Sequence, residues 1–280
     1  MKLTFYKCSP AENMTVLVWD PVAQTQYAEV ANEIMKESHL HAEQVGFVTE
    51  PVQQNSETIA RLEMMGGEFC ANATLSLAAV LSIRKKGIER TTNSRQAIQL
   101  ETSGIKESVI CYVDRGDTEY KRKVTLQLPL PEKISTMDFS SEGENVEGTL
   151  VELPGIAHVI VDEKKTNDRE TFFRIIQKRL ESEQFDALGV MFFDDEKCFM
   201  QPLVWVRATD SLFWERGCGS GTAALGIAKA AQIGESVKLE VQQPGGTLGV
   251  KVDWKQGQAE GLWLSGEVKV VAEGIAYLEG

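Results

Sequence analysis

The sequence has few of the features that would place a protein in a membrane or outside the cell. No apolar run reaches the roughly 18 residues that a membrane-spanning helix needs. The N-terminal stretch MKLTFYKCSPAEN becomes polar too soon for a secretory signal peptide. The five cysteines, an odd number without an export signal, indicate reduced thiols. We therefore expect a cytoplasmic protein without a membrane partner.

Metal-binding and phosphate-binding patterns are equally scarce. Only three histidines occur, and His39 and His41 form a His-x-His without a nearby Cys/His pair. There is no CxxC pair or zinc-type spacing, and the Walker motif GxxxxGK is absent. We therefore expect no metal site, and we interpret the two neighbouring histidines as part of a polar loop after a helix.

Positive charge is also in short supply. The chain has 29 Lys and Arg against 41 Asp and Glu, which gives a formal net charge of −12. This balance argues against nucleic acid and anionic membranes as partners, because basic patches drive both kinds of binding. An anionic small molecule is not excluded, since backbone amides bind anions locally.

What the sequence does contain is a repeat. Each copy reads strand, amphipathic helix, two strands, a Gly-rich turn with a cysteine, and a second helix. Cys218 follows Cys70 by 148 residues, and the small length differences between the copies lie in loops. The predicted elements are 13–19, 23–38, 43–48, 60–65, 71–85, 97–103 and 107–113 in the first copy, and 157–162, 167–182, 188–193, 198–206, 222–231 and 237–243 in the second.

The repeat and the length of 280 residues predict two similar domains. Segment 128–150 is rich in Pro, Gly and polar residues and separates the copies. We expect the first domain at 1–122 and the second at 123–264. The strand-like segment 265–280 lies beyond the second copy and is expected to return to the first domain.

Each copy places a cysteine at the start of a helix. The stretch GGEFCANAT holds Cys70, and ERGCGSGT holds Cys218. The first amides of a helix lack internal partners and, with the helix dipole, bind anions and lower the pKa of a thiol. Two equivalent thiols suit a reaction in which one removes a proton from a carbon and the other supplies one to the opposite face. A carboxylate held by the helix N-termini would take up the developing charge, so this scheme requires no cofactor.

The remaining cysteines and histidines fit this chemistry less well. Cys8, Cys111 and Cys198 lack the Gly-rich context, and we expect them to pack as small hydrophobic residues. A Cys–His hydrolase would need a histidine beside a thiol. His158 lies in a predicted strand, and no Cys–His partner pattern is recognisable.

The motifs FCANAT and GCGSGT resemble the two signature motifs of the diaminopimelate epimerase superfamily, which includes cofactor-independent amino-acid racemases. The resemblance covers nearly the whole chain. The stretches SPAENMTVLV, EQVGF, QPLVWV, WERGCGSGT and QPGG are most similar to the histidine racemases that make D-histidine for opine-type metallophores of the staphylopine kind. The resemblance implies an α/β (α+β) fold of two pseudo-symmetric domains, each a mostly antiparallel sheet wrapped around a central helix. It also implies a homodimer that acts on an amino acid without pyridoxal phosphate.

The same resemblance assigns residues. Cys70 and Cys218 would form the acid–base pair. Glu43 matches an acidic position of the histidine racemases, where a carboxylate would accept a hydrogen bond from an imidazole N–H. Ala71 replaces the glycine that usually follows the first cysteine. The other residues expected to bind substrate are Asn13, Asn72, Gly219, Ser220, Gly221 and Thr222, together with Ala71 itself.

Departures from the epimerase pattern disfavour diaminopimelate as the substrate. Ile156 and Ala157 stand where the epimerases have Asn-Pro, and Gly189 stands where they have a second substrate-binding Asn. Glu215 and Arg216 lie closer to the second cysteine than the Glu-Arg pair of the family, which leaves their equivalence open.

The sequence therefore favours a histidine racemase that uses two thiols. Alternatives are a racemase or epimerase of another amino acid, a carboxylate-dependent isomerase of the phenazine-biosynthesis type, and a non-catalytic amino-acid binding protein on the same fold. The two intact thiols argue against the last two. Proline racemases also use paired cysteines, but their motifs, Cys-Gly-His-Gly and Cys-Gly-Thr-Gly, differ from those in this chain.

Overall fold

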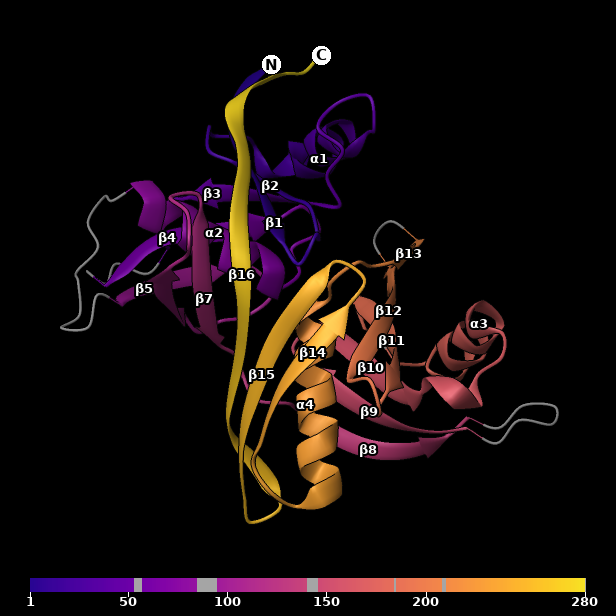
Figure 1. Ribbon diagram of the computed structural model, residues 1–280. Helices are drawn as coiled ribbons and strands as arrows, with labels where there is room; N and C mark the ends of the chain where they lie inside the picture. Colours follow the sequence, from indigo (N-terminus) through magenta and orange to yellow (C-terminus); the bar gives the residue numbers. More distant parts are fainter. Residues whose placement is uncertain (53–56, 85–94, 140–145, 184, 208–209, 280) are drawn as a thin grey trace. The chain divides into compact units, whose positions relative to one another are not determined.

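The two copies of the repeat each form a curved sheet around one buried helix (Figure 1). The computed structural model describes residues 1–279 except 53–56, 85–94, 140–145, 184 and 208–209. The chain divides into unit 1, which consists of Met1–Gln127 and Ser265–Gly280, and unit 2, which consists of Leu128–Leu264.

Unit 1 is a closed ring of strands around α2 (Ala71–Arg84). The ring closes because β1 pairs with β16 on one side and with β2 on the other. A short 3-10 helix, η1 (Gln24–Gln26), leads into α1 (Tyr27–Met35), which packs against β3. The strands are β1 (Lys2–Pro10), β2 (Thr15–Val18), β3 (Gln44–Thr49), β4 (Thr58–Met64), β5 (Gln96–Thr102), β6 (Val109–Arg115), β7 (Lys121–Gln127) and, from Ser265 onward, β16 (Gln258–Tyr277).

The central helices consist mainly of small and apolar residues, which lie on every side of the helix. All residues of α2 from 71 to 82 are buried, and a helix without a polar face is stable only when it is covered all round. In α4 (Gly219–Ile233), Gly226 lets the sheet approach closely, because a Cβ there would lie 2.6 Å from the Val250 side chain. These two sequences therefore specify interior helices.

Unit 2 repeats the pairing order of unit 1. The pair β10–β11 is parallel like β2–β3, and β12–β14 is parallel like β4–β5. The other strand pairs with a described register are antiparallel. The predicted fold class, a mostly antiparallel sheet around a central helix in each copy, is confirmed. The further elements are β8 (Lys133–Asp138), β9 (Glu147–Leu153), β10 (Ile156–Asp162), η2 (Glu163–Lys165), α3 (Arg169–Arg179), β11 (Ala187–Asp194), β12 (Phe199–Val206), β13 (Ser211–Trp214), β14 (Val237–Gln243) and β15 (Gly246–Lys255).

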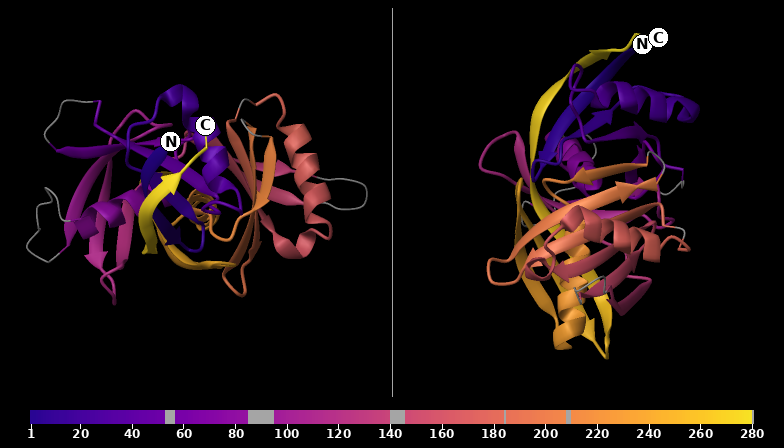
Figure 2. Two further views of the ribbon diagram at one scale, coloured as in Figure 1. Left: turned by 90° about the horizontal axis from the view of Figure 1, so that it is seen from above. Right: turned by 90° about the vertical axis from the view of Figure 1, so that its right-hand side faces the viewer.

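Strand alternation gives the sheet of unit 2 two different faces. Ala157 and Val159 of β10 share a hydrophobic cluster with Phe172 of α3. His158 lies between them in the strand and therefore points to the opposite face, toward α4. Figure 2 shows α3 outside these strands. The alternation thus places the polar side chain of His158 next to the central helix α4.

The segment 128–150, expected only to separate the copies, contributes the antiparallel pair β8–β9. The strand order ends at β8, whose exposed residues are polar. An edge strand of this kind shows weak hydrophobic alternation, and the flanking Pro and Gly hide it further. The strands β1 and β13 are likewise additional to the elements expected.

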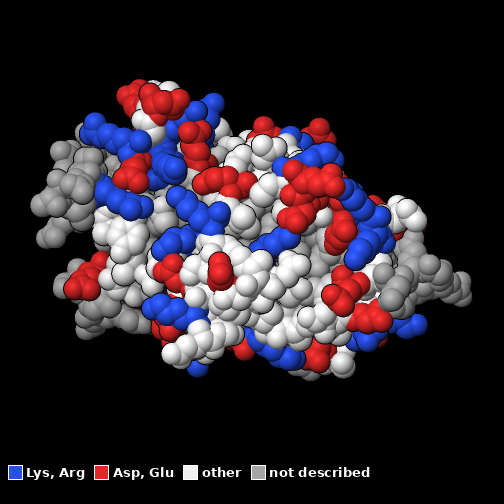
Figure 3. Space-filling view, turned by 60° about the horizontal axis from the view of Figure 1, so that its bottom comes forward, with Lys and Arg blue, Asp and Glu red and all other residues white. Residues whose placement is uncertain are grey.

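The surface carries charges of both signs. On the face shown in Figure 3, Lys and Arg lie among Asp and Glu rather than in a single basic patch. Over the described ranges, no helix has both the length and the apolar character needed to cross a membrane.

Candidate active site

Cys70 caps the N-terminus of α2. Its Sγ accepts a hydrogen bond from the backbone N–H of Ala73 at 3.3 Å, and its carbonyl oxygen accepts one from the N–H of Thr74 at 3.0 Å. This is the pattern of an N-cap residue, whose side chain meets an amide without a partner in the helix. Ala71 and Asn72 follow in the first turn, and both are buried. The half-buried thiol therefore lies at the positive end of the helix dipole.

Gln44, which the sequence analysis did not identify, contacts the same thiol. The thiol of Cys70 donates a hydrogen bond to Gln44 Oε1 at 2.6 Å. In β3, Val45 and Phe47 belong to the core beneath α1, so alternation turns Gln44 to the other face. The only signal in the sequence was its position, directly after Glu43 in the stretch EQVGF.

Asn13 and Glu43 meet where β2 and β3 begin. Asn13 is fully buried, and its Nδ2 donates to Glu43 Oε2 at 3.0 Å. Within the described ranges, Asn13 Oδ1 is buried without a hydrogen-bond partner. Buried polar atoms rarely stay unpaired, so this oxygen is suited to accept a hydrogen bond from a ligand. Glu43 is half-buried and bonded rather than part of an exposed loop.

Cys218 caps α4 as Cys70 caps α2. Its Sγ accepts from the N–H of Gly221 at 3.3 Å, the same distance as in unit 1. Gln243, a residue that the sequence analysis missed, accepts from the Cys218 N–H through Oε1 at 2.7 Å and donates through Nε2 to Thr222 Oγ1 at 2.8 Å. Arg216 bonds to the turn after Gln243 through Nη2 and its own carbonyl oxygen. This network fixes the loop before α4 on the end of β14.

The first turn of α4 is the glycine-rich cradle expected from the sequence, and it consists of Gly219, Ser220, Gly221 and Thr222. A Cβ at Gly221 would lie 2.3 Å from the sulfur of Met191, so only glycine fits there without displacing β11 side chains. Thr222 Oγ1 donates to the carbonyl of Cys218 at 2.6 Å. The turn therefore presents backbone amides next to the thiol.

His158 stands behind this turn. Its Nε2 lies 2.9 Å from Ser220 Oγ, which in turn lies 3.6 Å from Cys218 Sγ. Burial lowers the pKa of His158 to about 3, so the ring is neutral near pH 7. A Cβ at Gly189 would lie 2.3 Å from His158 Nδ1, so the glycine makes room for the ring. The sequence analysis placed His158 in a strand but not beside a thiol, because 62 positions separate it from Ser220.

Burial and Glu215 set the protonation state of Cys218. Burial raises the pKa of the Cys218 thiol well above its ordinary value, and the nearby, hydrogen-bonded Glu215 carboxylate raises it further. The N–H of Gly221 and the hydroxyl of Ser220 act in the opposite direction but more weakly. From the sequence alone, the helix N-terminus predicts a lowered pKa for this thiol. The net direction is the reverse, because the loss of hydration outweighs the amides.

The other three cysteines do not cap a helix in the part of the chain that the structure describes. Cys8 and Cys111 are fully buried, and burial raises the pKa of both, that of Cys8 to about 12. Cys198 is half-buried, and its pKa is raised, mainly by burial. Across the described residues, no group of three or more His, Cys, Asp or Glu side chains is arranged to hold a metal ion.

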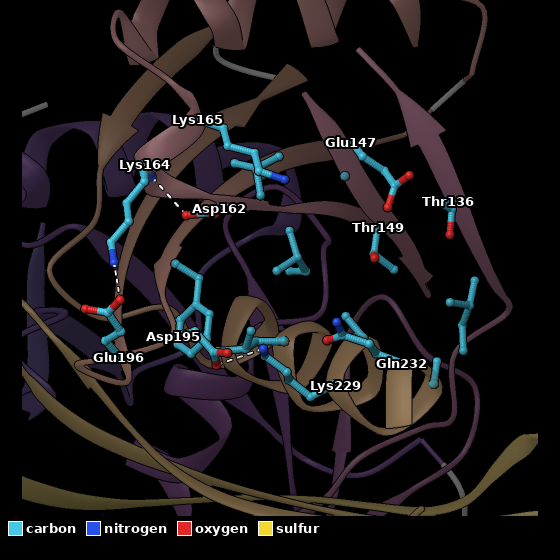
Figure 4. Close-up of a pocket in the computed structure, with 18 residues that line it drawn as sticks. Thr136, Glu147, Thr149, Asp162, Lys164, Lys165, Asp195, Glu196, Lys229 and Gln232 are labelled. Carbon is cyan, nitrogen blue, oxygen red and sulfur yellow. Dashed lines mark hydrogen bonds and ion pairs between the residues drawn. The ribbon is translucent and has the colours of Figure 1, made fainter. Parts of the chain in front are cut away.

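A cavity of about 570 Å³ in unit 2 lies at the opposite end of α4 from Cys218 (Figure 4). Most of its charges neutralise one another. Lys164 pairs with Glu196 at 2.7 Å, and Lys229 pairs with Asp195 at 2.8 Å. No residue assigned from the sequence lines this cavity, so the candidate positions are the N-terminal end of α2 in unit 1 and that of α4 in unit 2, each taken by itself.

Comparison with known sequences agrees with these features. A profile described as "Histidine racemase CntK N-terminal domain" matches residues 2–277. A histidine racemase of Fusobacterium nucleatum is 33% identical over 281 residues, which cover 99% of this chain and 97% of the relative. A histidine racemase of Staphylococcus aureus is 29% identical over 280 residues, which cover 99% of this chain and 98% of the relative.

Solved structures share the fold at low sequence identity. A hydroxyproline epimerase from Agrobacterium vitis with bound trans-4-hydroxy-L-proline has a TM-score of 0.72 at 10% identity, covering 100% of this chain and 93% of its own. A probable proline racemase from Agrobacterium radiobacter has a TM-score of 0.68 at 11% identity, covering 99% and 93%. The profile match over almost the entire length shows that the chain belongs to the histidine racemase family and is an isomerase, an amino-acid racemase.

Proposed function

We propose that the protein interconverts L- and D-histidine with two thiols and no cofactor. The observation that carries this proposal is the matched position of Cys70 and Cys218. Each sulfur lies 3.3 Å from a first-turn amide of a buried central helix. A duplicated binding protein without catalysis would not need a thiol at both positions. The histidine racemases that resemble this chain over its full length support histidine as the substrate.

In the proposed reaction, one cysteine acts as a thiolate and accepts the proton from Cα of histidine. The other acts as a thiol and donates a proton to the opposite face of the same carbon. The electron pair of the broken C–H bond is stabilised by the α-carboxylate and returns in the new C–H bond, so the two sulfurs exchange protonation states. The helix amides would bind the carboxylate and stabilise its added charge. No oxidant, reductant or leaving group is involved, so proton transfer alone completes the reaction.

The surroundings of Cys218 support a thiol there in the resting enzyme. Its raised pKa keeps the sulfur protonated near pH 7. Ser220, held by the neutral His158, and the carboxylate of Glu215 contact this sulfur and would orient the proton that it gives or receives. At Cys70, the N–H of Ala73 would stabilise the complementary thiolate, with the Gln44 amide turned so that Nε2 instead of Oε1 faces the sulfur.

Histidine would be recognised in unit 1 by Asn13 and Glu43. The unpaired Oδ1 of Asn13 would accept a hydrogen bond from the α-ammonium group, and Glu43 would accept one from an imidazole N–H. Ile156 and Gly189 offer no side-chain donor for a distal carboxylate, so diaminopimelate would bind poorly.

We further propose that the D-histidine produced is a building block of an opine-type metallophore, as the family resemblance suggests. The protein would act as a homodimer in the cytoplasm. Its five cysteines are free thiols, a state suited to a reducing compartment.

Incubation of dialysed, chelator-treated protein with L-histidine in D₂O tests the proposed chemistry. We expect loss of optical rotation, with deuterium at Cα of the D-histidine formed. Cys70→Ser and Cys218→Ser should each reduce racemisation to near background, because a serine hydroxyl is a far weaker acid than a thiol. The matched control Cys198→Ser should stay active, since this thiol lies outside both N-caps.

Two results would refute parts of the proposal. Full activity in either of the N-cap variants would exclude the two-thiol mechanism. Racemisation that appears only after pyridoxal phosphate is added would exclude cofactor independence.

A further inference from the structure

A second cavity, of about 550 Å³, lies in unit 1 at the C-terminal end of α2. Its wall is formed by Ile83 and by the turn that joins β6 to β7, with Arg115 and Arg122 on its lining. Since α2 has 14 residues, this end lies about 20 Å along the helix from Cys70. The cavity is therefore separate from the candidate active site.

Arg115 and Arg122 are direct partners across the antiparallel strands β6 and β7. Side chains at such positions share one face of the sheet, and like charges there destabilise the strand pair. Arg122 is only 7% exposed, and burial, together with the charge of Arg115, lowers its pKa. The fold thus keeps a buried guanidinium group next to a second one, at a cost in stability.

Protein groups satisfy Arg122 only in part. Its Nε donates to Ser82 Oγ at 3.1 Å, and its Nη1 donates to the carbonyls of Glu119 and Lys121 at 3.0 and 2.7 Å. Within the ranges that the structure describes, Nη2 has no hydrogen bond and neither of the two arginines has an ion pair. The Glu119 carboxylate also lines the cavity, but it hydrogen-bonds to the hydroxyl of Tyr120.

The hydrogen-bond donors and the charge of the two arginines indicate what would bind there. The two guanidinium groups are positive, and the C-terminal end of α2 offsets about half a charge. The Glu119 carboxylate offsets up to one more, so only a small excess of positive charge is left around the cavity. A phosphate monoester has three terminal oxygens and can accept paired hydrogen bonds from two guanidinium groups at once, whereas a carboxylate has only two oxygens. We propose that this cavity binds the phosphate group of a small phosphorylated metabolite between Arg115 and Arg122.

The corresponding end of the central helix in unit 2 provides a contrast. The cavity there has three lysines on its lining, of which Lys164 and Lys229 each pair with a carboxylate (Figure 4). Four carboxylates lie on the same lining: Glu147, Asp162, Asp195 and Glu196. The repeated fold therefore does not itself require an excess of cations at the end of a central helix. The arginine pair is particular to unit 1, and the volume of its cavity lies within the usual range of small-molecule sites, about 300–1,000 Å³.

Inorganic phosphate is the probe for this site. The full chain is titrated with phosphate by calorimetry, and with chloride and acetate at the same ionic strength. We expect binding of phosphate only. Arg115→Gln should weaken it about tenfold or more, as expected when one charge-assisted contact is lost. The control Lys123→Gln removes the same charge from the exposed side of β7 and should leave the affinity unchanged. Glu119→Gln should strengthen binding several-fold, because it removes the negative charge that lines the cavity.

Thermal unfolding separates ligand binding from damage to the fold. In chloride, Arg115→Gln should unfold at the wild-type temperature or above it, since repulsion with Arg122 is relieved, and its racemase activity should equal that of the wild type. Equal phosphate affinity in Arg115→Gln and Lys123→Gln would overturn the proposal. Acetate binding as tight as phosphate would also overturn it. Neither result would bear on histidine racemisation.

Discussion

At the residue scale, a cysteine at a helix N-cap is a poor choice for stability. Serine, threonine, aspartate and asparagine are the usual N-caps, because their oxygens accept strong hydrogen bonds from the first-turn amides. Sulfur is a weak acceptor, and yet both Cys70 and Cys218 occupy this position with sulfur–amide distances of 3.3 Å. A residue type that lowers helix stability at two equivalent positions is best explained by its chemistry.

We therefore predict that Cys218→Ser raises the stability of the protein while it removes activity. The serine oxygen would accept from the Gly221 N–H more strongly than sulfur does, and we expect a gain of up to about 1 kcal/mol in the free energy of unfolding. Urea denaturation measures it. Cys111→Ser should show the opposite, since burial alone raises the pKa of Cys111 and a hydroxyl there would lack a partner. A loss of stability in Cys218→Ser as large as that in Cys111→Ser would contradict this view of the N-cap.

Glu43 provides the second prediction at this scale. If Glu43 binds the imidazole, Glu43→Gln keeps the shape of the side chain and can still accept from Asn13 Nδ2, but it loses a charge-assisted bond worth about 1.5–3 kcal/mol. We expect kcat/KM for histidine to fall roughly ten- to hundredfold. Proton exchange on alanine, measured in D₂O, should fall much less. Equal losses on both amino acids would assign Glu43 to the scaffold or the chemistry instead of substrate recognition.

At the scale of elements, the period of the strands decides which side chains reach the central helices. Alternate residues of β10 pack beneath α3, and the residue between them, His158, turns toward α4 and bonds to Ser220. In β3, the same alternation buries Val45 and Phe47 under α1 and turns Gln44 to Cys70. A shift of either strand by one residue would exchange these sets, so each polar partner of a thiol depends on the hydrophobic packing of an outer helix.

The burial of His158 on β10 predicts a dependence of stability on pH. Its pKa is about 3 in the folded protein against about 6.5 in the unfolded chain, so between these values the unfolded state binds the additional proton. Its contribution is therefore fully present above about pH 6.5 and is lost as the pH falls toward 3. The limit is on the order of 5 kcal/mol, from about 1.4 kcal/mol for each pKa unit.

Denaturant unfolding of the wild type and of His158→Gln from pH 7 to pH 4 measures this dependence. The variant should lose less stability than the wild type over this range. The exposed His41 offers a matched control, and His41→Gln should follow the wild type. Parallel curves for the wild type and His158→Gln would show that His158 does not resist protonation in the folded state.

At the scale of the whole molecule, the repeat is a duplication of structure with different chemistry in each copy. Both units place a thiol on a helix N-terminus, but Cys70 donates to the neutral amide of Gln44, whereas Cys218 contacts the carboxylate of Glu215. The copies also differ at the far ends of their helices, as the Arg115–Arg122 pair of unit 1 and the lysine–carboxylate pairs of unit 2 illustrate. A reaction that needs a base and an acid at once benefits from such inequality.

The proposed reaction requires the two thiols to flank one carbon, and this predicts a redox test. In the absence of substrate, mild oxidation should inactivate the protein and link Cys70 to Cys218, provided that their Cα atoms come within about 7 Å. Dithiothreitol should restore activity, and non-reducing peptide mapping by mass spectrometry should detect the link. Saturating histidine should slow the inactivation. Inactivation through oxidation of a single thiol, with no link, would contradict a shared site.

The sequence by itself determined the repeat, the buried central helices, the two cysteine N-caps and the family. These features are written in contiguous residues: apolar helical stretches, strand alternation and the Gly-rich turns next to Cys70 and Cys218. The edge strand β8 was not predicted from the sequence, because a strand with only one neighbouring strand has a weak hydrophobic pattern. The local sequence pattern is sufficient to predict structure wherever a residue's environment is set by its neighbours in the chain.

Only the tertiary structure decided which residues surround the two thiols and in which direction the pKa of Cys218 is shifted. Gln44 meets Cys70, and His158 meets Ser220, through strand register, which brings together residues far apart in sequence. The helix N-terminus alone predicts a lowered pKa for Cys218, but burial and Glu215 raise it. A pKa depends on all the atoms that displace water around a group, and a strand pair is set by packing on both faces of a sheet. Neither a pKa nor the pairing of two strands can be predicted from a short stretch of sequence, because both depend on residues that only the fold brings together.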